Sequence, residues 1–229
     1  MAWIRYLLYF LLVAAITAML TQLEIAYPGS LRLQVFTDEF DVSGTSEFSP
    51  VEMIQPMILI VCGLLMAWVA VNFGSQRPVA FLFGGLALVF TIRELDYFFD
   101  RFVAGNLWQV LIAIAGAFLI AYTYRQRKRL NIALGRLWPS PGLALLFAGA
   151  VVLFVFVRLV GQEALWQAIM GEQYQRIVKL AVEEIIELIG YLLWLIGAIE
   201  YTYQVKSMSA RDPQPAAVKR RQTQRKAGP

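Results

Sequence analysis

The sequence predicts an all-α, polytopic membrane helix bundle with six transmembrane helices and both termini in the cytoplasm. The first observation is composition: the 229 residues are 59% hydrophobic and only 16% charged, whereas soluble domains are about 45–50% apolar and about 25% charged. The second is that apolar runs able to cross roughly 30 Å of hydrocarbon recur along the chain. The third is that lysine and arginine gather in alternate connections between these runs, which is typical of cytoplasmic loops.

The first three spans occupy the N-terminal part of the chain. Span one, residues 3–25, is too long for the apolar core of a signal peptide and ends without a clear small-residue cleavage motif, so we expect it to be retained. Span two, residues 51–73, follows an acidic outer loop at residues 27–50. Span three, residues 79–99, begins as VAFLFGGLALVF and ends in the charged stretch TIRELDYFFD.

The last three spans complete a transmembrane domain over residues 1–206. Span four, residues 107–124, ends before the basic segment RQRKR, and span five covers residues 142–160. Span six, residues 177–203, begins with VEEIIE and contains two glycines spaced to allow close helix approach. Residues 207–229 are polar and basic, so we expect a disordered cytoplasmic tail, whose lysines and arginines are also suited to contact anionic lipid headgroups.

Sidedness follows from the positive residues in the short connections. Arg5, Arg77, Arg136, Lys206 and the segment RQRKR all fall on one side if six spans are present, and the acidic outer loop falls on the other. This distribution predicts a multi-pass protein of the cell membrane and fits a bacterial inner membrane.

Composition excludes several classes of function. The chain has no histidine, so His-ligated haem, HExxH metalloproteases and Ser–His hydrolases are excluded. Its single cysteine, Cys62, cannot form an intrachain disulfide. The positive charges sit in loop patches without a base-stacking module, so no nucleic-acid partner is expected. A metal site would use carboxylates, which favour Mg²⁺, Ca²⁺ or Mn²⁺.

Charged side chains from several spans are predicted to meet in one layer near the outer surface. The motif closing span three and the motif opening span six lie at the same depth, and the end of span five brings an arginine to that level. Charges at this depth are costly against lipid, so they should turn inward and bring spans three and six together. The predicted ligand-binding residues are Arg93, Glu94, Asp96, Asp100, Arg158, Glu183, Glu184 and Glu187.

Three interpretations of this layer remain open at the level of sequence. In the first, Arg93 and Arg158 clamp the acids into a structural salt-bridge network. In the second, a divalent cation completes the set, with Asp96, Glu183 and Glu187 as its ligands. In the third, the surplus of carboxylates forms a pocket for a cationic ligand or holds protons.

Three functions correspond to these interpretations. The chain could bind a cation or cationic solute in the outer leaflet and even transport it. It could instead be an enzyme that modifies lipid headgroups or lipid-linked sugars, with Arg93 or Arg158 binding phosphate. It could also be a non-catalytic accessory subunit. Membrane lipids are the expected partners in every case, and the sequence predicts neither an oligomeric state nor a substrate.

Overall fold

The computed structural model describes residues 2–27, 50–103 and 105–211, and within these ranges every regular element is helical. Most of the predicted outer loop and the tail beyond residue 211 lie outside the described residues.

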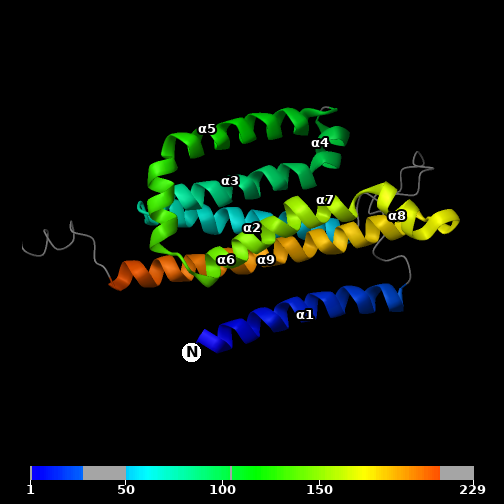
Figure 1. Ribbon diagram of the computed structural model, residues 1–229, viewed down its shortest axis with the longest axis horizontal. Helices are drawn as coiled ribbons and strands as arrows, with labels where there is room; N and C mark the ends of the chain where they lie inside the picture. The colour runs from blue at the N-terminus through cyan, green and yellow to red at the C-terminus, as the bar shows by residue number, and fades with distance from the viewer. Residues whose placement is uncertain (1, 28–49, 104, 212–229) are drawn as a thin grey trace, which may run out of the picture.

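The long helices run in alternating directions along one axis (Figure 1). Short helices lie at the end of the bundle opposite to the described terminal residues, Ala2 and Arg211. The elements are α1 (Ala2–Ala26), α2 (Pro50–Asn72), α3 (Arg77–Glu94), α4 (Asp96–Phe102), α5 (Leu107–Arg136), α6 (Pro141–Val151), a π-helical turn (Val152–Phe156), α7 (Val157–Val160), α8 (Glu163–Met170), a 3₁₀ turn (Gly171–Gln173) and α9 (Arg176–Arg211).

Four of the described helical stretches are long and apolar enough to cross a membrane. They are Trp3–Ala26, Val51–Asn72, Leu107–Arg136 and Pro141–Val160. Only 6% of the most apolar window of α1 or of α5 is buried inside the protein. A soluble monomer rarely exposes apolar surface on this scale, whereas lipid tails cover it in a bilayer. These are the helices of a multi-pass membrane protein.

Close packing of α6 against α9 depends on glycine. A Cβ on Gly142 of α6 would lie 2.5 Å from the backbone nitrogen of Tyr201, and one on Gly197 of α9 would lie 2.8 Å from the backbone nitrogen of Leu146. The two helices therefore touch through their main chains at these points. The spacing of Gly190 and Gly197 predicted such an approach, and the structure identifies α6 as the partner.

Helix α3 lies between α2 and α5 (Figure 1). A Cβ on Gly84 would lie 3.0 Å from the Cβ of Met66 on α2, which shows how closely these two helices approach. The backbone of α9 instead packs on α6 and α2. Helix α3 reaches α9 through long side chains such as Phe90, whose ring centroid lies 5.4 Å from that of Trp194. Spans three and six thus meet, but by side chains rather than by backbone packing.

The stretch TIRELDYFFD belongs to two helices, contrary to the prediction of one span over residues 79–99. Helix α3 ends at Glu94 and α4 begins at Asp96. The Asp96 carboxylate accepts a hydrogen bond from the Tyr97 backbone N–H at 2.6 Å. An acidic residue in the first turn of a helix interacts favourably with the helix dipole, so the sequence itself supports a helix that begins here.

Two helices extend beyond their predicted ends. Helix α5 continues through RQRKR to Arg136 and bends across the end of the bundle (Figure 1). Leu130 and Ala133 are buried there while the flanking arginines stay outside, as in an amphipathic helix. Helix α9 continues into the predicted tail as far as Arg211 because Val205, which is 1% exposed, still packs against the core.

A polar contact near its N-terminus holds α1 to the bundle. Arg5 donates to Glu200 of α9 from Nε at 3.2 Å and from Nη2 at 2.9 Å, and the Tyr9 hydroxyl donates to Glu200 at 3.0 Å. Glu200 is only 1% exposed. The apolar contribution of α1 is small, since Leu20 is its buried hydrophobic side chain and Val13 and Ile16 are partly buried against the core.

Substitution of Arg5 by methionine is expected to loosen α1 from α9. Hydrogen bonds to a charged group contribute about 1.5–3 kcal/mol, and few apolar contacts of α1 compensate for their loss. Spin labels on the exposed residues Leu11 of α1 and Ile132 of α5 should give a broader distance distribution in this variant than in the wild type. Methionine at the exposed Arg158 is the control; equal distributions in all three proteins would show that Glu200 does not anchor α1.

Candidate functional site

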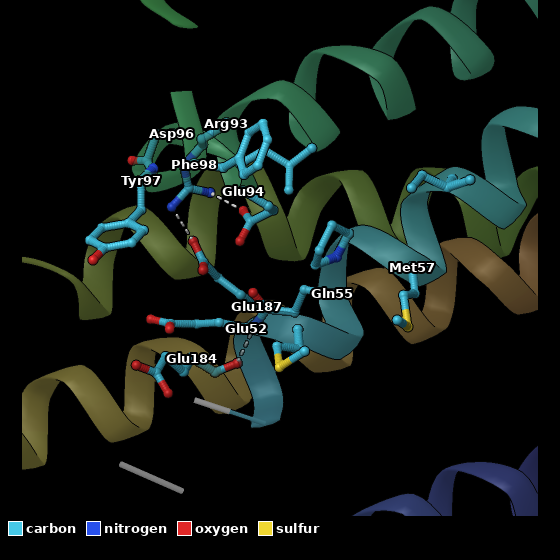
Figure 2. Close-up of a pocket in the computed structure, with 14 residues that line it drawn as sticks. Glu52, Gln55, Met57, Arg93, Glu94, Asp96, Tyr97, Phe98, Glu184 and Glu187 are labelled. Atoms are coloured by element: carbon cyan, nitrogen blue, oxygen red, sulfur yellow. Dashed lines mark hydrogen bonds and ion pairs between the residues drawn. The ribbon is translucent and has the colours of Figure 1, made fainter. Parts of the chain in front are cut away.

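A cavity of about 460 Å³ lies between α2, the α3–α4 junction and α9 (Figure 2). Its apolar lining includes Met53, Met57 and Ile60 of α2 and Phe98 of α4, which are also exposed on the outside of the bundle. Among the described residues, its polar lining holds five carboxyl groups and one guanidinium. These belong to Glu52, Glu94, Asp96, Glu184, Glu187 and Arg93.

Arg93 joins acids from two helices. Its Nη2 lies 2.7 Å from Glu187 Oε1 on α9, and its Nη1 lies 3.3 Å from Glu94 Oε1 on α3. The Tyr191 hydroxyl also donates to Glu94 Oε1, at 2.7 Å. The side chains of Glu94 and Glu187 are 8% and 7% exposed. A carboxylate this deeply buried needs a partner, and Arg93 supplies it to both.

The second oxygen of each of these carboxylates is unpaired. Within the described residues, Glu187 and Glu94 make their hydrogen bonds and ion pairs through Oε1, which leaves both Oε2 atoms without a partner. Both side chains line the cavity (Figure 2). Because an ionised carboxylate oxygen accepts about two hydrogen bonds, the two Oε2 atoms can each receive a donor placed in the cavity.

Acids from α2 and α9 lie together on another part of the wall. Gln55, which is 1% exposed, donates to the backbone carbonyl of Glu184 at 3.3 Å and so ties α2 to α9. Beside this contact the carboxyl groups of Glu52 and Glu184 point in the same direction (Figure 2). Adjacent like charges favour a cation between them and disfavour an anion.

Three predicted site residues lie outside the lining of this cavity. Asp100 accepts a hydrogen bond from the backbone N–H of Asn106 at 2.7 Å and so stabilises the turn between α4 and α5. Glu183 pairs with Lys179 at 3.0 Å, one turn along α9. Arg158 is exposed on α7 and forms no ion pair with the acids that the structure describes. Of the two arginines predicted to clamp the acids, only Arg93 does so.

The three predicted metal ligands make different contacts in the structure. The part of the chain that is described contains no group of three or more cysteine or acidic side chains placed to hold one ion. Asp96 accepts a hydrogen bond from the Tyr97 backbone N–H at the start of α4, and Glu183 forms an ion pair with Lys179. Only Glu187 of the three is both buried and turned into the polar cluster.

An aromatic layer lies directly behind the polar cluster. The Phe90 ring centroid lies 5.9 Å from that of Tyr191 and 5.4 Å from that of Trp194. Trp194 is 1% exposed and also contacts Phe83, at 6.4 Å between centroids. The rings of this layer pack between α3 and α9.

Tyr191 belongs to the site but was not among the predicted residues. It follows Glu187 by one helical turn, so the two side chains share a face of α9. The spacing was therefore visible in the sequence, but tyrosine is so common near membrane interfaces that the signal had little weight.

Comparison with known proteins adds no functional assignment, since the chain matches no protein-family model, no curated protein and no solved structure.

Proposed function

We propose that this chain is a six-span protein of the cell membrane that binds an organic cation in the outer leaflet. The observation that carries the proposal is the cavity of about 460 Å³ whose lining holds five carboxyl groups against one guanidinium. The remaining elements of the proposal are the membrane topology, the size of the ligand and its chemical class.

The topology requires α3 and α9 to cross the membrane in addition to the four apolar stretches. Within α9, residues 185–202 contain only two charged side chains, Glu187 and Glu200, and both are paired inside the protein. Helix α3 has 18 residues, about 27 Å at 1.5 Å per residue, and it is enclosed by α2 and α5. The charged side chains in the membrane-spanning parts of these two helices are therefore largely shielded from lipid.

Sidedness is inferred from the positions of the arginines and lysines. The start of α1, the start of α3 and the ends of α5 and α9 lie at one end of the bundle (Figure 1), and these segments carry Arg5, Arg77, Arg136 and Lys206. The positive-inside rule makes this end cytoplasmic, together with both termini. The cavity then lies in the outer leaflet. This sidedness fits a protein of a bacterial inner membrane.

The ligand is inferred from charge and volume. An acid-rich wall with two carboxylate oxygens that accept no hydrogen bond from the described residues attracts a cation that donates hydrogen bonds. The volume of the cavity is in the range of small-molecule pockets, about 300–1,000 Å³, and the described residues provide no group of three acidic side chains for a metal ion. An amine or substituted ammonium ion satisfies both requirements.

Binding is better supported than transport or catalysis. The rings of Phe90, Tyr191 and Trp194 pack together between α3 and α9, and the groove that continues from the cavity along α2 and α3 is apolar, so it offers no polar path for an ion. Among the described residues that line the cavity, none is a serine, threonine or cysteine that could act as a nucleophile. A receptor or accessory role for a bound amine is consistent with both features.

The experiment is a thermal-shift titration of the purified protein in nanodiscs with ethanolamine, choline, methylammonium, Mg²⁺, Ca²⁺ and Mn²⁺. We expect at least one organic cation to raise the Tm, because a ligand present at about 100 times its Kd stabilises the folded state by about 2.7 kcal/mol. The divalent ions should have no effect beyond that of ionic strength. A response to the divalent ions alone would replace the organic cation by a metal.

The matched variants are Glu184→Gln and Glu172→Gln. Both remove one negative charge from the same end of the bundle, but only Glu184 lines the cavity, while Glu172 is exposed in the 3₁₀ turn. Glu184→Gln should weaken binding about tenfold or more, the equivalent of losing a hydrogen bond to a charged group, and Glu172→Gln should bind normally. Equal affinities would mean that the cavity is not the binding site.

A further inference from the structure

A second, apolar cavity of about 390 Å³ continues from the acidic one along the surface of α2 and α3. Ile60 lines both cavities, and residues 59–70 of α2 and 80–91 of α3 line the second. Its wall is made of apolar side chains, with Thr91 as the polar exception, and the Thr91 hydroxyl is bonded to the Ala87 backbone carbonyl at 2.8 Å. We call this cavity the α2–α3 groove.

We propose that the α2–α3 groove holds the hydrocarbon chain of an amine-bearing lipid whose ammonium group occupies the acidic cavity. This inference rests on the proposed function and specifies its ligand as a single-chain cationic amphiphile. Its support comes from the dimensions of the groove, from its glycines and from the charge of the cavity that it joins.

The groove is long enough for a hydrocarbon chain. From Ile60 to Ala70 the α2 wall extends about 15 Å at 1.5 Å per residue, which is half of the roughly 30 Å of hydrocarbon in a bilayer. Ala70 lies two residues before the end of α2, so a chain that follows the groove away from the acidic cavity runs from the middle of the bundle towards its cytoplasmic end. The chain of the proposed ligand therefore lies deeper in the bilayer than an ordinary acyl chain of the outer leaflet.

Small side chains keep the groove open. Gly63, Ala67 and Ala70 of α2 line it opposite Ala80, Gly84 and Gly85 of α3. A Cβ added to Gly63 would meet no atom within 4 Å, so this glycine is not required for helix packing. The space in front of it is open.

Charge in the adjoining cavity selects the headgroup. Hydrocarbon gains little by moving from lipid tails to an apolar groove, because both surroundings are equally apolar. The affinity must therefore come from the ammonium group and the unpaired oxygens of Glu94 and Glu187. The groove contributes selection by shape, and a neutral lipid with the same chain should not be retained.

Photo-crosslinking in nanodiscs tests this proposal. The probe is a long-chain alkylammonium ion with a diazirine in the middle of its chain, and the neutral alcohol of the same chain is the comparison probe. We expect the cationic probe to label the segments of α2 and α3 that line the groove, as mapped by peptide mass spectrometry. The neutral probe should label the lipid-exposed helices without this preference.

Two glycine variants make the test specific. Gly63→Leu introduces a large side chain into the groove at a position where a Cβ meets no atom within 4 Å, and Gly116→Leu places the same side chain on α5 at a position with the same property. Gly63→Leu should lose the preferential labelling but keep the thermal shift with ethanolamine, methylammonium or choline. Gly116→Leu should keep both.

The outcomes separate this inference from the proposed function. If a short amine binds but the long-chain probe shows no preference for the groove, the groove proposal is wrong and the cation site stands. Equal labelling of the groove by the neutral probe also overturns the proposal, since it shows ordinary boundary lipid. If neither short nor long-chain amines bind, both proposals fail.

Discussion

Replacing Arg93 by methionine is expected to lower the free energy of unfolding by about 3 kcal/mol. The substitution leaves two carboxylates in the protein interior, Glu94 and Glu187, with only the Tyr191 hydroxyl to compensate them. Breaking a buried ion pair by removal of one partner typically costs 3–5 kcal/mol. The lower end of this range applies because Arg93 itself is 29% exposed.

The measurement is reversible unfolding in mixed detergent micelles, with Arg158→Met as the matched control. Both variants lose one arginine near the outer end of the bundle, but Arg158 is exposed and forms no ion pair with the described acids. Its loss should change stability by no more than about 0.5 kcal/mol. If the two variants are equally stable, Arg93 does not hold the cluster together.

A double variant distinguishes an unpaired charge from lost packing. Arg93→Met combined with Glu187→Gln removes one of the two uncompensated carboxylates, so we expect it to be more stable than Arg93→Met alone. Residues in one ion-pair network show interaction energies of about 0.5–3 kcal/mol in such cycles. Purely additive effects would indicate that the Arg93 methylenes, and not its charge, matter.

Replacing Gly142 by alanine is expected to cost about 1–3 kcal/mol through forced separation of α6 and α9. The new Cβ would lie 2.5 Å from the nitrogen and 2.7 Å from the Cα of Tyr201. These are main-chain atoms of a buried helix, so they cannot rotate away as the end of a side chain could. The same unfolding experiment measures the cost.

Gly116→Ala on α5 is the control for helix propensity. A Cβ there meets no atom within 4 Å, and alanine is more favourable than glycine in a helix interior by about 1 kcal/mol. This variant should therefore be as stable as the wild type or slightly more so. A Gly142→Ala protein that behaves in the same way would contradict the close main-chain contact between α6 and α9.

The sequence by itself determined the helical membrane architecture. Apolar runs in lipid must satisfy their backbone hydrogen bonds internally, so length and composition were sufficient to predict the positions of α1, α2 and the stretch from α6 to α7. The spacing of Gly190 and Gly197 also identified a close helix contact, because i and i+7 share a helix face. The charges of spans three and six were correctly expected to meet, because lipid does not tolerate them.

Only the tertiary structure decided which of these charged residues form the site. Asp100 and Glu183 are satisfied by neighbours close in sequence, Asn106 and Lys179, whereas Arg93 and Glu187 reach each other between helices. Sequence periodicity fixes the face on which a side chain lies, but not which of several partners on other helices comes within bonding distance. That choice depends on the break of α3 at Leu95 and on α9 packing against α6 through glycine, both of which set the separation of the helices.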